Sequence, residues 1–204
     1  NFAASHFVVG MAEYDDGEEF FLLYRPSAVN ETGTALGEWL YGSNFADVLS
    51  GGDGDDVLIG YLGNDAASGG NGNDDFGGDP GPDTIDGGAG IDRVHYDLNG
   101  LMAVGITANL QAQTVVAGAE TDTLVSIEGV TGTQLADTLI GSTGSNQIWG
   151  AEGDDQIFGQ VVSGGAYQGA ATGGDTLARE WGNDTIQGSA GNDTLVRGWG
   201  PGGG

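Results

Sequence analysis

Apolar residues recur along most of this chain with a spacing of nine residues. Each nine-residue unit has a glycine-rich stretch of six residues, followed by three residues of which the middle one, at position eight, is apolar. Such a triplet predicts a short strand whose middle side chain points into a core, while positions seven and nine point outward. The residues expected to point inward are Leu49, Leu58, Ala67, Phe76, Ile85, Val94, Leu139, Ile148, Ile157, Leu177, Ile186 and Leu195.

The units form two blocks in constant register. The first block, residues 33–95, holds seven consecutive units, and the second, residues 132–196, holds six units divided by an irregular insertion at residues 159–169. Position six is Asp in 11 of the 13 units, although only 21 of the 204 residues are Asp. The repeat is therefore specific to position and is not an effect of composition.

Three segments lie outside the blocks. Residues 96–131 keep few glycines and alternate like strands, and we interpret them as a spacer of glycine-poor coils that continues the same stack. Residues 1–32 carry no repeat, and Phe7–Val9 and Phe20–Tyr24 predict two strands that cap the first coil, as the end of a solenoid requires. Residues 197–204 form a glycine-rich tail.

Two units per coil make an 18-residue turn of an all-β solenoid, in which Asp residues 18 apart lie above one another on one edge. Glycines at positions one, two and four permit the positive φ that a tight loop needs. Carboxylates stacked about 5 Å apart repel each other unless a cation lies between them. Oxygen ligands in a loose geometry of six or more favour Ca²⁺ over Mg²⁺.

The position-six Asp residues are therefore the predicted metal ligands. Six stacked pairs predict about six calcium ions: Asp47/Asp65, Asp56/Asp74, Asp65/Asp83, Asp74/Asp92, Asp137/Asp155 and Asp175/Asp193. The full set of predicted carboxylate ligands is Asp47, Asp56, Asp65, Asp74, Asp83, Asp92, Asp137, Asp155, Asp175, Asp184 and Asp193.

Composition excludes several classes of protein. Collagen is excluded because 42 Gly come with only 4 Pro, and the longest apolar run, Phe20–Tyr24, is too short for a transmembrane segment. The chain has no Cys, so it has neither a disulfide nor a thiolate site. A net charge of -26 excludes nucleic acid and anionic membrane surfaces as partners and favours cations.

The sequence resembles the RTX family, the glycine-rich nonapeptide β-roll proteins with the calcium-binding repeat GGxGxDxUx. The units Gly51–Ile59 (GGDGDDVLI) and Gly69–Gly77 (GGNGNDDFG) carry this pattern, and Asp122–Ser142 resembles the linker that commonly introduces such blocks. The resemblance implies a right-handed parallel β-roll, secretion through a type I channel, and folding on Ca²⁺ outside the cell. It also implies ligand carbonyls near positions one and three, which are occupied here by Gly51, Asp53, Gly69, Asn71, Gly87 and Ala89.

Departures from the family pattern predict weaker sites in some units. Glu38 and Asn146 replace Asp, Phe45 and Leu135 replace the glycine at position four, and Arg179 replaces the first glycine. Family members usually continue for several dozen residues after the repeats as an uncleaved secretion signal. Only Arg197–Gly204 follow here, so we expect the chain to be a fragment or a trimmed form.

Two functions are consistent with this interpretation. The first is a secreted calcium-binding protein, extracellular or associated with the cell surface, with a structural or adhesive role in a surface layer, filament or adhesin. Its partners would be calcium ions together with further copies of the chain or other surface proteins. The alternative is the C-terminal secretion and folding module of an exported protease, lipase or epimerase. Residues 1–32 are too few for a catalytic domain, so we expect the chain itself not to be an enzyme.

Other candidate sites receive plainer interpretations. Sequence neighbours such as Asp74 and Asp75 point in opposite directions on a strand, so they do not form a catalytic pair. His95, at an outward position nine, is expected to be a surface histidine. Position nine also carries Ile140, Trp149 and Phe158 in consecutive units, and we expect the insertion to fold over them, the alternative being a contact face for another subunit.

Overall fold

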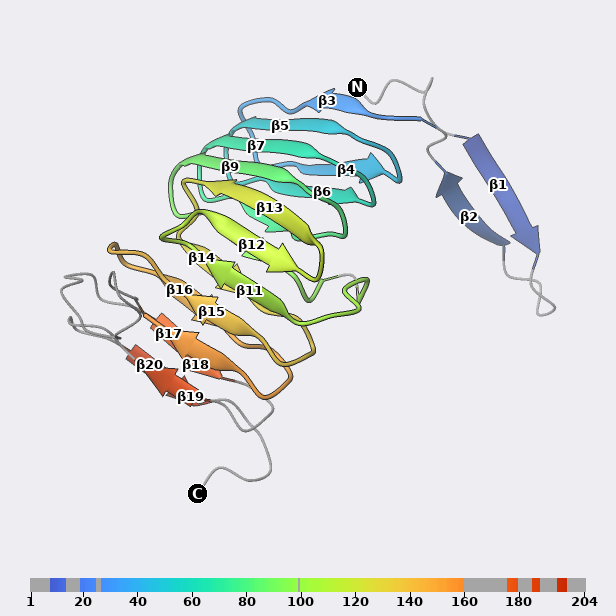
Figure 1. The fold of residues 1–204 in the computed structure, drawn as a ribbon. Coiled ribbons are helices and arrows are strands. Elements are labelled where there is room, and N and C mark those ends of the chain that lie inside the picture. Colours follow the sequence, from blue (N-terminus) through green and yellow to red (C-terminus); the bar gives the residue numbers. More distant parts are fainter. Residues whose placement is uncertain are drawn as a thin grey trace.

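The fold was analysed in a computed structural model that describes residues 8–13, 19–24, 27–98, 100–159, 176–179, 185–187 and 194–197. The described elements are all strands, and they form two long sheets and one hairpin (Figure 1). No described segment forms a helix long and apolar enough to cross a membrane.

The two long sheets face each other across a narrow core, and the chain alternates between them (Figure 1). The ten-stranded sheet contains, in spatial order, β19 (Thr185–Gln187), β17 (Gln156–Phe158), β15 (Thr138–Ile140), β11 (Ile106–Asn109), β12 (Thr114–Ala117), β13 (Glu120–Val125), β9 (Thr84–Ala89), β7 (Ala66–Asn71), β5 (Val48–Asp53) and β3 (Asn30–Thr32). The eight-stranded sheet contains β20 (Thr194–Arg197), β18 (Thr176–Arg179), β16 (Gln147–Trp149), β14 (Gly129–Thr131), β10 (Arg93–His95), β8 (Asp75–Gly77), β6 (Val57–Tyr61) and β4 (Trp39–Ser43).

Within the repeat blocks, neighbouring strands are parallel and 18 residues apart in sequence. In the ten-stranded sheet Leu49 pairs with Ala67, and Ala67 pairs with Ile85. In the eight-stranded sheet Leu40 pairs with Leu58, and Leu58 pairs with Phe76. The predicted all-β parallel roll with two units per coil is confirmed.

The position-eight residues form the core. Leu49, Leu58, Phe76, Ile85, Val94, Leu139, Ile148, Ile157 and Leu177 are buried, while Ala67 and Ile186 are partly buried against them. Each fully buried aliphatic side chain of this kind contributes about 1.5–3 kcal/mol to folding. The prediction is wrong for Leu195, which is 58% exposed, because its strand β20 is the last strand of its sheet among the described residues.

The segment between the blocks continues the stack only in part. Strands β13 and β14 form one further coil, with β13 parallel to β9 and β14 parallel to β10. Strands β11 and β12 do not form a coil: with β13 they make an antiparallel meander inside the ten-stranded sheet, and β11 is parallel to β15. In the other sheet β10 pairs directly with β14. The sequence interpretation as coils therefore holds for β13 and β14 and is wrong for β11 and β12, because alternating strands of this length fit a meander as well as a coil.

The ends of the chain differ from the repeats. Strands β1 (Val8–Glu13) and β2 (Glu19–Tyr24) pair with each other in a separate antiparallel sheet, so neither extends the two long sheets. Strand β3 lies within the segment assigned to the cap and is the terminal strand of the ten-stranded sheet. Most of the insertion and of the glycine-rich tail lies outside the described residues.

The outward residues at position nine do not form one surface. Ile140 pairs with Phe158 in the ten-stranded sheet, whereas Trp149 lies in the other sheet beside Thr131 and Ala178. The prediction of a single patch is wrong because consecutive units alternate between the sheets. The expectation that the insertion folds over these residues lies outside the described part of the chain.

Candidate metal centre

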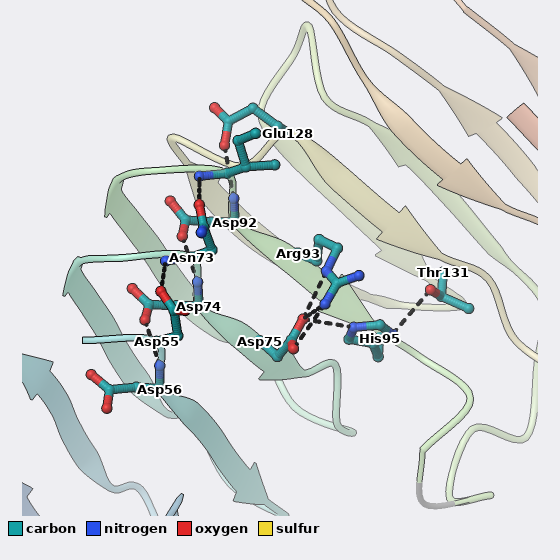
Figure 2. Close-up of polar contacts among 11 residues, drawn as sticks. Asp55, Asp56, Asn73, Asp74, Asp75, Asp92, Arg93, His95, Glu128 and Thr131 are labelled. Carbon is teal, nitrogen blue, oxygen red and sulfur yellow. Dashed lines mark hydrogen bonds and ion pairs between the residues drawn. The ribbon is translucent and has the colours of Figure 1, made fainter. Parts of the chain in front are cut away.

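The position-six acids of the first block form two rows, one along each edge of the roll. On one edge Asp56, Asp74 and Asp92 lie above one another, and each Oδ1 accepts a hydrogen bond from a backbone N–H one coil earlier (Figure 2). The donors are the N–H groups of Glu38, Asp56 and Asp74, each at 2.8 Å. These bonds define a row of carboxylates held by the backbone of the neighbouring coil.

The other edge repeats this arrangement. The N–H of Asp47 donates to Asp65 Oδ1 at 2.8 Å, and the N–H of Asp65 donates to Asp83 Oδ1 at 2.7 Å. In the second block the N–H of Asp137 donates to Asp155 Oδ1 at 2.9 Å. The stacked pairs predicted within these residues therefore lie together as expected from the 18-residue coil. Asp175, Asp184 and Asp193 lie outside the described residues.

Residues from outside the repeats end both rows of the first block. Glu128 Oε2 accepts the N–H of Asp92 at 3.0 Å, and Asp122 Oδ1 accepts the N–H of Asp83 at 3.0 Å. Sequence reasoning missed both acids. A signal was present for Asp122, because Asp122-Thr123-Leu124 repeats the Asp-Thr-Leu of positions six to eight in the unit of Asp137.

The second carboxylate oxygen points back into its own loop, toward the glycine at position one. The Oδ2 atoms of Asp56, Asp65, Asp74 and Asp92 are buried and have no hydrogen-bond partner. A Cβ added to Gly69 would overlap Asp74 Oδ2 and would lie 2.7 Å from the carbonyl oxygen of Gly87 in the next coil. Carboxylate and carbonyl oxygens thus converge above the glycine, in a cradle that a side chain would fill.

This geometry corrects the role predicted for position-one glycines. Positive φ values occur at positions two and four, as in Gly70 (113°) and Gly72 (136°), but not at Gly69. The glycine at position one is required because the adjacent carboxylate leaves no room for a Cβ.

The donor set fits a hard cation such as Ca²⁺. All the converging atoms are oxygens, and a buried carboxylate oxygen without a partner is unfavourable unless a positive charge compensates it. No group of three or more acidic, His or Cys side chains suited to a metal occurs among the described residues. Backbone carbonyls must therefore complete any site in this part of the chain.

The predicted residues at position one lie beside these carboxylates. Gly51, Gly69 and Gly87 form the floors of the cradles along one edge. At position three, Asp53, Asn71 and Ala89 are in register in β5, β7 and β9. Their carbonyls also connect the coils, because Asn71 accepts the N–H of Gly54 at 2.7 Å and Ala89 accepts the N–H of Gly72 at 2.9 Å.

Burial makes ionisation of the rows unfavourable in the absence of a cation. Burial, with neighbouring carboxylates adding to it, raises the pKa of Asp65 and of Asp74 to about 6 and that of Asp83 to about 8. The pKa values of Asp56, Asp92 and Asp137 are also raised, again chiefly by burial. A cation between the carboxylates would remove this conflict.

Tyr96 binds Asp122, the acid that ends one row. Its hydroxyl donates to Asp122 Oδ2 at 2.6 Å, and its ring lies over Gly78, the position-one glycine of the unit that contains Asp83. The ring thus occupies the place where other units hold their cradle.

A separate polar cluster lies on the outer face of the eight-stranded sheet (Figure 2). Arg93 donates two hydrogen bonds to Asp75, both at 2.9 Å, and its guanidinium lies 6.0 Å from the ring centre of Trp149. His95 lies between Asp75 and Thr131, with Nε2 3.1 Å from Asp75 Oδ1 and Nδ1 3.0 Å from Thr131 Oγ1. The cluster connects β8, β10, β14 and β16, while Asp74 points away from it into the edge row, as predicted.

Comparison with known proteins agrees with this geometry. A family model described as RTX calcium-binding nonapeptide repeat (4 copies) matches residues 32–67, 41–76, 68–98, 131–160 and 180–201. These ranges together span more than half of the sequence. No curated protein matches it.

Proposed function

Because the chain belongs to the family of RTX calcium-binding nonapeptide repeats, we propose that it is a secreted protein whose roll folds around Ca²⁺ outside the cell. The repeats of this family bind Ca²⁺, and the chain is a calcium-binding β-roll protein. The proposal goes further, to the coupling of binding and folding and to the role of the folded roll.

The observation that carries this coupling is the set of buried Oδ2 atoms without partners on Asp56, Asp65, Asp74 and Asp92. Bound Ca²⁺ supplies positive charge to these oxygens. The backbone N–H groups of the neighbouring coil orient each carboxylate through Oδ1, and the position-one carbonyls add further oxygens. The site needs two adjacent coils, so the unfolded chain lacks it and the cation stabilises only the folded state.

We propose a structural or adhesive role for the folded roll, in a surface layer, a filament or an adhesin. What supports it is an extended stack of coils with a net charge of -26, which bound ions would partly neutralise. We also propose that the roll is not catalytic. In the outer cluster Thr131 is buried, with only 8% of the residue exposed, and Asp75 is paired with Arg93. We infer that the cluster holds neighbouring coils together.

A calcium titration of the metal-stripped chain, followed by far-UV circular dichroism and light scattering, tests the proposal. We expect a disordered spectrum to become β-rich with a steep midpoint, and the mass to grow if the roll assembles. Folding without growth in mass would favour the alternative role as a folding module of an exported enzyme. A stripped chain that is already β-structured and insensitive to Ca²⁺ would contradict the coupling of binding and folding.

A further inference from the structure

The residue at position two differs between units, and with it the surroundings of the position-six side chain. In four of the described units it is Ser or Thr, and its own N–H and hydroxyl donate to the side chain at position six. The N–H of Thr133 donates to Asp137 Oδ2 at 2.6 Å, and its hydroxyl donates to Oδ1 at 3.0 Å. The same pairs are Ser43 with Asp47, Ser142 with Asn146 and Thr34 with Glu38.

In other units position two has a left-handed backbone. The φ values are 113° at Gly52, 71° at Tyr61, 113° at Gly70 and 96° at Gly88. These are the units of Asp56, Asp65, Asp74 and Asp92, whose Oδ2 atoms are buried without a partner. The positive-φ residues of the described chain do not include Thr34, Ser43, Thr133 or Ser142. The two classes therefore do not overlap.

Tyr61 shows that the left-handed conformation belongs to the loop and not to glycine alone. A residue with a Cβ adopts this region at a cost of about 1–2 kcal/mol. The N–H of Tyr61 donates to Asp79 Oδ2 at 2.8 Å and not to Asp65 in its own unit. The left-handed residue thus turns its donor away and leaves the carboxylate of its own unit unsatisfied on one side.

We propose that position two determines which units bind Ca²⁺. Where Ser or Thr donates two hydrogen bonds, the loop satisfies the carboxylate itself, and a cation would have to displace those bonds. In the units of Asp56, Asp65, Asp74 and Asp92, where position two is left-handed, Oδ2 has no hydrogen-bond partner, and a cation would compensate its charge. The inference rests on the proposed function, since it assumes that the roll binds Ca²⁺, and it specifies where.

The inference changes the predicted set of sites. Ions are expected at Asp56, Asp65, Asp74 and Asp92, but not at Asp47 or Asp137, although all six stand at position six. Ala151, with φ 65°, places the unit of Asp155 in the binding class. The unit of Asp83 belongs to neither class, because the Tyr96 ring lies over its glycine.

The four described Ser and Thr units have a consistent location. They are the first two units of each block, at residues 33–50 in the first and 132–149 in the second. A fifth Ser at position two, Ser189 in the last unit, lies outside the described residues. Two units make one coil, so each block begins with a coil whose position-six side chains are satisfied by the protein. The ion-dependent coils of the first block then stack on one that needs no ion.

Thr133→Gly tests the proposal in a unit whose position-six carboxylate is hydrogen-bonded by the residue at position two. It removes the hydroxyl and permits positive φ, and we expect native mass spectrometry in saturating Ca²⁺ to count one more bound ion than in the unchanged chain. Thr133→Ser keeps both donors and is the matched control, expected to bind the original number. Asp137→Asn added to Thr133→Gly should remove the gained ion.

An unchanged count in Thr133→Gly would overturn the proposal while leaving the proposed function intact, because the other sites would still bind. Failure of the unchanged chain to bind any Ca²⁺ would overturn the proposed function itself. Should Thr133→Gly not fold, Ser43→Gly with Ser43→Thr as its control tests the same point in the other block.

A measurement on the unchanged chain requires no variant. The ¹³C resonances of the Asp side-chain carboxyl groups report ligation directly during a Ca²⁺ titration. We expect those of Asp56 and Asp74 to shift and those of Asp47 and Asp137 to move much less once folding is complete. Equal shifts in all four would overturn the proposal.

Discussion

The backbone N–H of Asp74 donates to Oδ1 of Asp92, 18 residues later in the chain, at a distance of 2.8 Å. The same bond joins Asp56 to Asp74, so each carboxylate is fixed by the coil before it. Oδ1 thus connects the coils, while Oδ2 is buried without a hydrogen-bond partner. Because the two oxygens of one carboxylate have different contacts, replacing such an Asp affects both the connection between coils and the predicted calcium site.

Asp74→Asn keeps the side-chain shape but removes the charge, and we expect it to weaken calcium-induced folding. A hydrogen bond or ligand contact to a charged group is worth about 1.5–3 kcal/mol, which corresponds to about a 10- to 100-fold loss of affinity at that site. A calcium titration followed by circular dichroism should show a higher midpoint.

Asp75→Asn is the matched control, since Asp75 adjoins Asp74 but faces the outer surface and pairs with Arg93. Its partly exposed ion pair contributes less than about 1 kcal/mol. If Asp75→Asn raised the calcium midpoint as much as Asp74→Asn, the assignment of the edge row as the ligand set would be wrong.

The metal-free chain should become less stable as the pH rises. The pKa of an unfolded Asp is about 3.9, whereas burial raises it to about 6 for Asp65 and Asp74 and to about 8 for Asp83. Between these values the folded chain binds more protons than the unfolded chain, so its free energy of unfolding decreases with increasing pH. Far-UV circular dichroism of the stripped chain should show more β structure near pH 5 than near pH 8. The opposite trend would show that burial does not dominate these groups.

Gly69→Ala should damage a site without changing any ligand. The added Cβ overlaps Asp74 Oδ2, and overpacking of this kind costs about 1–3 kcal/mol. We expect a raised calcium midpoint and a lower melting temperature in Ca²⁺. Gly144→Ala is the control, because its Cβ would meet only Ser142 Oγ, 3.7 Å away, and it should leave both quantities unchanged.

Tyr96→Phe should destabilise the roll in the presence of Ca²⁺. The change removes the donor to Asp122 Oδ2 inside the protein, and a buried acceptor left unsatisfied costs about 1–3 kcal/mol. Urea unfolding in saturating Ca²⁺ measures the loss. In a double-mutant cycle, Asp122→Asn combined with Tyr96→Phe should cost less than the sum of the single changes, and simple additivity would contradict the coupling of the two residues.

The repeat predicts the roll because its signals are local. Position-eight residues such as Leu58 and Phe76 recur at the spacing of the strands, and Asp56 and Asp74 are one coil apart. The spacing of residues along the chain is therefore enough to predict the core residues and the rows of carboxylates at the edges. The bond of Tyr96 to Asp122 could not be predicted, because it depends on the register of an antiparallel meander that lies outside the repeat. The prediction that Leu195 is buried failed for a related reason, since its burial depends on a neighbouring strand beyond its own unit.

Two classes of unit differ in whether Ser or Thr at position two donates hydrogen bonds to the side chain at position six. The residues that separate these classes, Ser and Thr at position two, were visible in the sequence. The distinction was missed because every position-six Asp was treated alike. Only the structure shows that Thr133 donates to Asp137, whereas Gly70 adopts a φ that leaves Asp74 unsatisfied.

The meander gives the roll two more strands on one side than on the other. Strands in a sheet lie about 4.8 Å apart, so one wall is longer than its opposite by about 10 Å. We expect walls of unequal length to bend the roll at the junction between the blocks. If copies of the chain joined end to end, each copy would add one such bend. The assembly would then curve into a ring or wind into a helix instead of growing as a straight rod.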